Sequence, residues 1–202
     1  MFKYNIHCHK EVLPIRKTNK ISDLLKIRCA QCGECCCDPM IELTHHDLRR
    51  LVKHTGLPAE KLSAFYSNSI LNSDIDDDGW VKLSYGKRKM GLRKKQDGTC
   101  MFLSKKRQCK AYEARPISCR VFPIDVILDD DNEIIDLELS DVVLEKFIDC
   151  KHYRGKAVSH KKFMLNATLS RDETASYWKK LKRWNDHPET GRKTDFLKFM
   201  GF

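Results

Sequence analysis

Hydrophobic and polar positions recur along the chain with two different periods, which together predict both helices and strands. The stretch LTHHDLRRLVKHTG predicts a helix, because Thr44 is a good N-cap, Asp47 completes a capping box and Gly56 supplies the stop. The next stretch, LPAEKLSAFYSNSI, starts with a proline suited to a first helical turn and is also predicted to be helical. The spacing of apolar residues from His160 to Trp184 predicts a long helix.

Alternating apolar residues predict two hairpins. WVKLSYG and KRKMGLRKK are expected to pair with a turn near Gly86, and VFPIDVILDDDNEIIDLELS is the clearer hairpin, with its turn at Asp129 to Asn132. The terminal DFLKFMGF is expected to form a last docking turn. A chain of 202 residues can bury one ordinary core. We therefore expect an α+β fold, with one small domain over residues 1–155 and a basic helical extension over residues 156–202 packed on it.

Composition and charge restrict where in the cell this domain is expected to work and what it is expected to contact. Hydrophobic residues make up 41% and charged residues 33% of the chain, and no apolar run approaches the roughly 20 residues of a membrane span. The first residues include no apolar signal-peptide region, so a cytoplasmic location is expected. Most of the net charge of +10 lies after Lys151. Such a tail could contact nucleic acid, but a solvated lysine-rich helix is the favoured interpretation.

The ten cysteines are the strongest chemical signal in the sequence, and five of them fall within IRCAQCGECCCDPM. In a reducing compartment such density indicates metal binding rather than disulfides, and bridges between adjacent cysteines would be strained. Cys29, Cys32 and Cys35 place three thiolates on one loop, where Gly33 permits a positive φ. Neighbouring cysteines such as Cys35 and Cys36 are expected to serve opposite sides of this loop. The spacing fits both an iron–sulfur cluster and a zinc site, and more distant cysteines would complete either one.

The segment ARPISCRVFP surrounds one of those distant cysteines with prolines and arginines. The prolines fix the backbone on either side of Cys119. Arg115 and Arg120 are predicted to place positive charge beside the thiolates, which would stabilise the deprotonated ligands and raise the reduction potential of a cluster. The alternative is that these arginines pair with Glu113 or Asp125 at the surface.

Other candidate motifs carry less weight. His45 and His46 could point toward the cysteine loop, but surface histidines are the favoured explanation. The acidic run DIDDDG is followed by no glutamate at the position that a calcium loop requires, so an acidic turn is preferred. The chain contains no GxGxxG, P-loop, GxSxG or HExxH motif, so nucleotide-binding and zinc-protease chemistry have no support.

Several ordered motifs resemble the YkgJ/FliB cysteine-cluster family, a zinc- or iron-chelating domain: CAQCGECC from Cys29, CMFL from Cys100, CKAYEARPISCRVFP from Cys109, and the later Cys150. The resemblance covers about residues 27–152 and leaves Cys8 and Cys37 outside the family pattern. The ligand pool that it implies consists of Cys29, Cys32, Cys35, Cys36, Cys100, Cys109, Cys119 and Cys150. Flagellin lysine methylases of this family are larger and use a four-iron cluster with S-adenosylmethionine as methyl source.

These observations predict a metal-binding or redox module that carries a [4Fe–4S] cluster, with zinc on the same thiolates as the main alternative. Eight thiolates fit either two four-thiolate centres or one cluster with spare cysteines. A second hypothesis is an iron–sulfur-dependent methyl or group transferase that modifies protein side chains. A third is a zinc-only structural protein whose basic tail contacts nucleic acid. Whether the chain is an enzyme, which protein partner or substrate it has, and its oligomeric state are left open.

Overall fold

A computed structural model describes residues 24, 26–29, 33–37, 40–71, 79–140, 152–154, 160–187 and 191–202, with only the backbone of residues 27–29, 152–154 and 162. Helices and strands both contribute, so the α+β prediction is confirmed. The described elements, in chain order, are β1 (Ile27–Cys29), η1 (Cys35–Cys37), α2 (His45–Thr55), α3 (Ala59–Leu62), β2 (Ser63–Tyr66), α4 (Asn68–Leu71), β3 (Val81–Leu83), β4 (Gly86–Leu92), η2 (Tyr112–Ala114), α5 (Ile117–Val121), β5 (Ile124–Leu128), β6 (Ile134–Leu139), β7 (His152–Arg154), α7 (His160–Asn185) and α8 (Lys193–Met200). None of the helices in these ranges is both long and apolar enough to cross a membrane.

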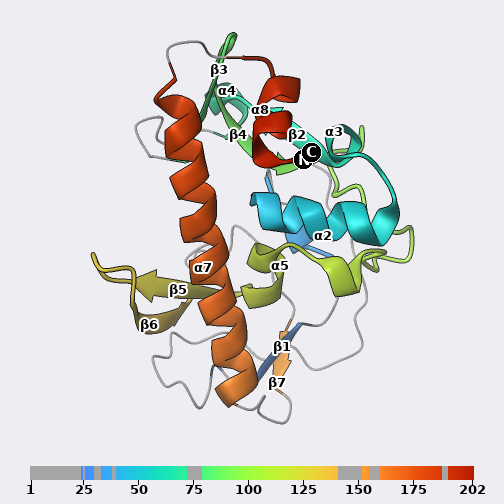
Figure 1. Ribbon diagram of the computed structural model, residues 1–202. Helices are drawn as coiled ribbons and strands as arrows, with labels where there is room; N and C mark the ends of the chain where they lie inside the picture. The colour runs from blue at the N-terminus through green and yellow to red at the C-terminus, as the bar shows by residue number, and fades with distance from the viewer. Residues whose placement is uncertain are drawn as a thin grey trace.

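The helices α7 (His160–Asn185) and α2 (His45–Thr55) cross each other, and the other elements are arranged around them (Figure 1). The long α7 runs along one side, and α2 lies across it with its first turn toward α7 (Figure 1). The predicted caps of α2 are confirmed: the Asp47 amide donates to Thr44 Oγ1 at 3.1 Å, and Asp47 Oδ2 accepts the Thr44 amide at 2.8 Å. Gly56 ends the helix with a φ of 68°. Leu48 and Leu51 are fully buried, so this helix is fixed by both its local signals and its packing.

The prediction of a continuous helix after Pro58 is wrong in its middle part. The α3 turn ends at Leu62, and Ser63–Tyr66 is instead the strand β2, which pairs with β4. The Tyr66 hydroxyl donates to the Leu92 carbonyl at 2.7 Å, and the Ser63 hydroxyl donates to the carbonyl of Ala59. A partner strand distant in sequence therefore overrides the local apolar period.

The sheet order is β2-β4-β3, so the predicted hairpin of β3 and β4 is confirmed. The segment before α2 also follows β4, because the Leu43 amide donates to the Met90 carbonyl and the Leu92 amide to the Ile41 carbonyl. This close approach requires Gly91, where a Cβ atom would lie 2.7 Å from Cγ of Met40. The same pairing places the residues just before α2 beside the sheet.

The second predicted hairpin, β5 and β6, is confirmed with its turn after Leu128. It packs against α7 through a small apolar cluster that includes Ile124, Leu137 and Ala167. Just before it lies α5, a five-residue helix that the sequence did not predict. Because α5 contains Cys119, its placement matters for the site.

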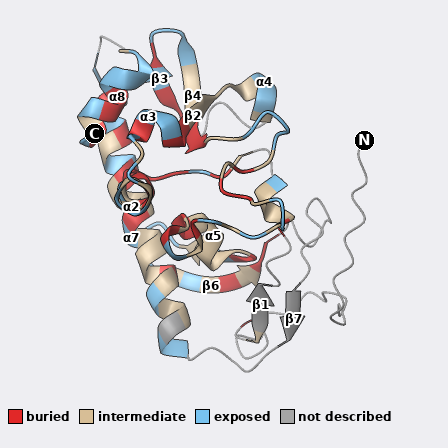
Figure 2. Cartoon of the chain, turned by 90° about the vertical axis from the view of Figure 1, so that its right-hand side faces the viewer, coloured by how far each residue is buried: buried red, intermediate tan, exposed pale blue. Residues whose placement is uncertain are grey.

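The main core lies where α2, α7, α8 and the sheet meet, which Figure 2 shows as the concentration of buried residues around these elements. Trp184 of α7 packs edge-on against Phe196 of α8, with ring centroids 5.3 Å apart, and its indole nitrogen donates to the Lys82 carbonyl at 2.8 Å. The terminal docking segment is the helix α8. Residues from both sides of the 155/156 boundary share this core, and the division into domains stays a prediction.

Candidate metal centre

The cysteine loop turns at Gly33 and continues into the short helix η1. The Cys36 amide donates to the Gly33 carbonyl at 3.2 Å. Gly33 has a φ of 75°, as predicted, and a Cβ atom there would lie 2.8 Å from Cδ1 of Leu103. Glycine thus allows both the turn and the close packing of this loop on the loop that contains Leu103.

Arg107 joins the same two loops at the surface. Its guanidinium binds the Glu34 carboxylate at 2.8 Å and donates to Cys37 Sγ at 3.7 Å. Cys37 is exposed, whereas Cys35 and Cys36 are half-buried.

The middle segment, residues 93–111, forms successive tight turns that carry two cysteines. The Cys100 amide donates to the Cys36 carbonyl at 2.7 Å, which ties this segment to the cysteine loop. The Phe102 amide donates to Cys100 Sγ at 3.5 Å, and the Ala111 amide donates in the same way to the thiol of Cys109. Each cysteine therefore receives an N–H from two residues further on. Such bonds stabilise a ligating sulfur and fix its orientation.

Five cysteines from three chain segments line one hollow of about 60 Å³, here called the cysteine hollow: Cys35, Cys36, Cys100, Cys109 and Cys119. Its other walls are largely apolar and include Ile41, Leu92, Phe102 and Phe122. The hollow is several times larger than the roughly 10–15 Å³ that one water needs. Cys35 and Cys36 both face it and hydrogen-bond with each other, so the expectation that they serve opposite sides of the loop is wrong.

The thiols of the cysteine hollow affect one another's pKa. The hydrogen bond with Cys100 lowers the pKa of Cys36, but the bond to Cys35 and burial outweigh it and raise this pKa to about 12. The bond with Cys36, followed by burial, raises the pKa of Cys100, and burial above all raises the pKa of Cys109 and Cys119. Several thiolates cannot be buried together without a compensating positive charge. A bound cation would supply that charge.

The two arginines predicted to lie beside the thiolates occupy different places. Arg115 lines the cysteine hollow, stacks 3.6 Å above the Tyr112 ring, and its charge offsets part of the effect of burial on Cys109 and Cys119. Arg120 instead donates to the backbone carbonyls of Arg115, at 2.9 Å, and Glu113, at 3.0 Å. The guanidinium of Arg120 thus braces the loop that presents Arg115.

The remaining predicted ligands lie at or beyond the limits of the described chain. Cys29 ends β1, where its backbone lies opposite His152 of β7. Cys32 and Cys150 fall outside the described residues, as does Cys8. The pairing of β1 with β7 joins two segments more than 120 residues apart in sequence, and Cys150 precedes β7 by two positions.

Within the part of the chain whose side chains are described, no three His, Cys, Asp or Glu side chains form an arrangement that could hold a metal ion. The thiols surround the cysteine hollow without closing on a single point. The donor set nevertheless consists of sulfur atoms in apolar surroundings, with amide donors on two of them. That chemistry fits zinc or iron and does not fit the oxygen-preferring magnesium or calcium.

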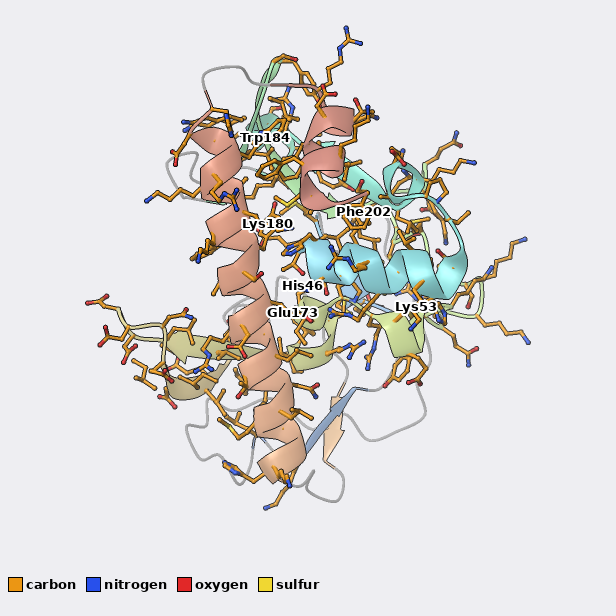
Figure 3. The ribbon with its side chains drawn as sticks, viewed as in Figure 1. His46, Lys53, Glu173, Lys180, Trp184 and Phe202 are labelled. Atoms are coloured by element: carbon orange, nitrogen blue, oxygen red, sulfur yellow. The ribbon has the colours of Figure 1, made fainter. Side chains whose placement is uncertain are left out.

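The histidine pair lies apart from the cysteine hollow. His45 is 2% exposed and stacks near Tyr177, so the explanation as a surface histidine is wrong for this residue. His46 Nε2 lies 3.2 Å from Ser176 Oγ, close to Glu173, where α2 meets α7 (Figure 3). Burial, and after it the positive charges of neighbouring side chains, lower the pKa of His45 to about 4. Neither imidazole lines the cysteine hollow.

A buried ionic network and a second cavity were not found from the sequence. Asp47 is 1% exposed and binds both Arg50 and the amide of Ile117, where α5 begins. Ile117 and Ser118 also form one wall of a groove of about 480 Å³, whose other lining residues include Tyr177 and Trp178 of α7. From the sequence, Asp47 was recognisable only as a helix cap, because its bond to Ile117 connects residues 70 positions apart.

Comparison with known proteins agrees with this donor set. The family model CxxCxxCC, described as "Putative zinc- or iron-chelating domain", matches residues 28–138, more than half of the chain. An uncharacterised protein of Methanocaldococcus jannaschii, MJ0661, is 29% identical over 99 residues, which make up 48% of this chain and 44% of that protein. The chain thus spans less than half the length of this curated relative, and no solved structure matches it. The chain therefore belongs to the CxxCxxCC family, whose domain is described as zinc- or iron-chelating.

Proposed function

We propose that Cys36, Cys100, Cys109 and Cys119 hold one metal centre, and that Cys29, Cys32, Cys35 and Cys150 provide the remaining ligands of the pool. The observation that carries this proposal is the convergence of thiols from three separate segments on the cysteine hollow. Within it, Cys36 hydrogen-bonds with Cys100, and the charge of Cys100 affects both Cys109 and Cys119. Four thiolates are what a closed zinc site or a [4Fe–4S] cluster requires.

The occupant that we propose is a [4Fe–4S] cluster, with zinc as the alternative. The spacing of Cys29, Cys32 and Cys35, with two residues between successive cysteines, is typical of iron–sulfur ligands and favours the cluster. Such a cluster supplies one-electron transfer when it is bound. The apolar walls would exclude water from the sulfur atoms, and the charge of Arg115 would favour the reduced state. The module would therefore serve as an electron carrier or as a metal-organised binding domain.

Isolation of the full chain without oxygen, followed by counting iron, acid-labile sulfide and zinc, tests this proposal. A cluster predicts iron and sulfide in equal amounts, about four of each per centre, together with visible thiolate-to-iron absorption. Colourless protein that contains only zinc would contradict the cluster and support zinc as the occupant. Folded protein with neither metal would contradict both.

The groove beside α5 supports a second candidate, a cluster-dependent methyl or group transferase. This groove of about 480 Å³ reaches Ile117 and Ser118, the two residues that precede Cys119, and its size is typical of small-molecule sites. The transferase candidate predicts that S-adenosylmethionine perturbs the cluster spectrum when it is titrated into anaerobically prepared protein. An unchanged spectrum at saturating cofactor would eliminate the candidate.

A further inference from the structure

Asp47 is buried at the meeting point of two helices and uses both carboxylate oxygens. Oδ1 accepts the Ile117 amide at 2.7 Å, and Oδ2 accepts both the amide and the hydroxyl of Thr44 at 2.8 Å. The first bond reaches α5, whereas the other two cap α2. One side chain therefore fixes the starts of two helices that are distant in sequence.

Arg50 connects this carboxylate to α7. Its guanidinium binds Asp47 and also binds both oxygens of Glu173, one of them at 2.8 Å. Glu173 is 7% exposed, and it points toward α2 from the middle of α7 (Figure 3). The charge of Asp47 is therefore paired, and its position is fixed from a third helix.

The hydrogen bond from the Ile117 amide to Asp47 matters for the start of α5, because this helix has only five residues. The N-cap of α5 is Pro116, which makes no side-chain capping bond, so the first amide of the helix depends on an external acceptor. Asp47 is that acceptor. Cys119 follows two residues later and lines the cysteine hollow.

We propose that Asp47 is a positioning residue of the metal centre: its carboxylate fixes the start of α5 and thereby sets the place of the Cys119 thiol. This inference rests on the proposed function, since Cys119 must be a ligand for the position of α5 to matter. Asp47 acts through Ile117 and does not touch the metal.

An amide in place of the carboxylate cannot serve all of these donors. Asp47 accepts from the Ile117 amide, the Thr44 amide and hydroxyl, and the Arg50 guanidinium. Asparagine offers one acceptor oxygen, and its NH₂ group would face donors on the other side. Asp47→Asn therefore weakens either the bond to α5 or the cap of α2 while keeping the size of the side chain.

The chain provides a matched control in α8. Asp195 occupies the same capping-box position there and accepts the Arg192 amide at 2.8 Å, but it is exposed. The helix α8 lies on the opposite side of α2 from α5 (Figure 1). Asp195→Asn removes the same kind of helix cap without touching the cysteine hollow. A comparison of the two variants separates the general loss of a cap from the specific loss of the Ile117 bond.

The test uses the full chain, freed of metal and titrated with Co²⁺ without oxygen. In Asp47→Asn we expect the metal affinity to fall by about 10- to 100-fold. At saturation, sulfur-to-cobalt absorbance per bound ion should drop by about a quarter, the share of one thiolate in four. Asp195→Asn should match the wild type in both readouts. The absorbance per bound ion is decisive, because destabilisation alone would not change it.

A second variant, Ile117→Pro, removes the donor instead of the acceptor at a position where a helix start tolerates proline. It should lower the absorbance per ion in the same way, and it decides the question if Asp47→Asn does not fold. If the folded Asp47→Asn or Ile117→Pro variant shows wild-type absorbance per ion and wild-type affinity, the positioning role of Asp47 is wrong, but the proposed function is unaffected. A wild-type chain that carries neither iron nor zinc when it is isolated without oxygen, and that shows no sulfur-to-cobalt bands, would overturn the proposed function, and this inference with it.

Discussion

The two ends of the main core are stabilised in different ways. On one side of α2, near α8, aromatic rings fill the space: Phe196 is fully buried and touches Phe65 and Trp184, with centroids 5.8 and 5.3 Å apart. On the other side of α2 lies α5 (Figure 1), and near it five thiols line the cysteine hollow of about 60 Å³. We call these regions the aromatic end and the cysteine end.

The difference indicates which part of the fold needs a ligand. Burial of apolar area stabilises the aromatic end without any bound group. The cysteine end buries several thiols whose thiolate forms repel one another. A bound cation or cluster would stabilise these thiolates. We therefore expect the dependence on metal to be confined largely to the cysteine end.

The largest effect is expected from removing a buried thiol. Cys100→Ser should abolish metal binding at the proposed centre and remove much of the stabilisation that it provides, which is about 10–16 kcal/mol for structural zinc sites. The measurements are metal content per chain and chemical denaturation. The matched control is Cys37→Ser, because Cys37 is exposed and does not line the cysteine hollow. Equal metal loss in both variants would contradict the assignment of ligands.

Metal removal should separate the two ends without mutation. After chelation, the backbone amides of Phe102 and Lys110, which bond near the cysteine hollow, should exchange with solvent much faster. The amides of α8 should keep most of their protection, because their contacts are apolar. Hydrogen exchange read by mass spectrometry measures both regions in one sample. Uniform loss of protection would show that the metal supports the whole core.

The aromatic end can be weakened by itself. Phe196→Ala removes a fully buried ring and should lower the free energy of unfolding by about 3–5 kcal/mol. Metal content per folded chain should stay at the wild-type level, since Phe196 does not line the cysteine hollow. Denaturation and metal analysis of the same preparation check both statements. A variant that folds but loses metal would contradict the separation of the two ends.

The smallest expected effect concerns pH and His45. The unfolded chain binds a proton at this residue near pH 6.5, whereas burial keeps the imidazole neutral in the fold down to about pH 4. Because the unfolded state binds more protons in that window, the free energy of unfolding should fall as the pH drops from about 6.5 to 4. His45→Asn should make the free energy of unfolding less dependent on pH in this window, by an amount that corresponds to up to about one bound proton. Denaturation at several pH values measures this dependence. An unchanged slope would show that His45 is not the group responsible.

Elements with local signals were predictable from the sequence. The helix α2 begins at a capping box and ends at a glycine, and both features are present where the sequence indicates them. The strand β2 and the helix α5 were missed because their decisive bonds are long-range: Tyr66 to Leu92 and Asp47 to Ile117. Neither bond leaves a trace in the local pattern of apolar residues.

The candidate site was predictable in its chemistry but not in its arrangement. The cysteine spacing indicates thiolate ligands, and the structure brings five of these cysteines to one hollow. Which cysteines meet depends on how the turns from residue 93 to 111 pack on η1, which the spacing does not encode. The same limit applies to Arg115 and Arg120, which are equivalent in sequence, although only Arg115 reaches the cysteine hollow.

X-ray absorption at the edge of the bound metal tests the central claim most directly, because it reports which atoms surround the ion in the intact, anaerobically prepared chain. Convergent thiolates predict a first shell of sulfur alone, at about 2.3 Å from the metal. A first shell of nitrogen and oxygen only would contradict the claim that the thiols of the cysteine hollow hold the metal.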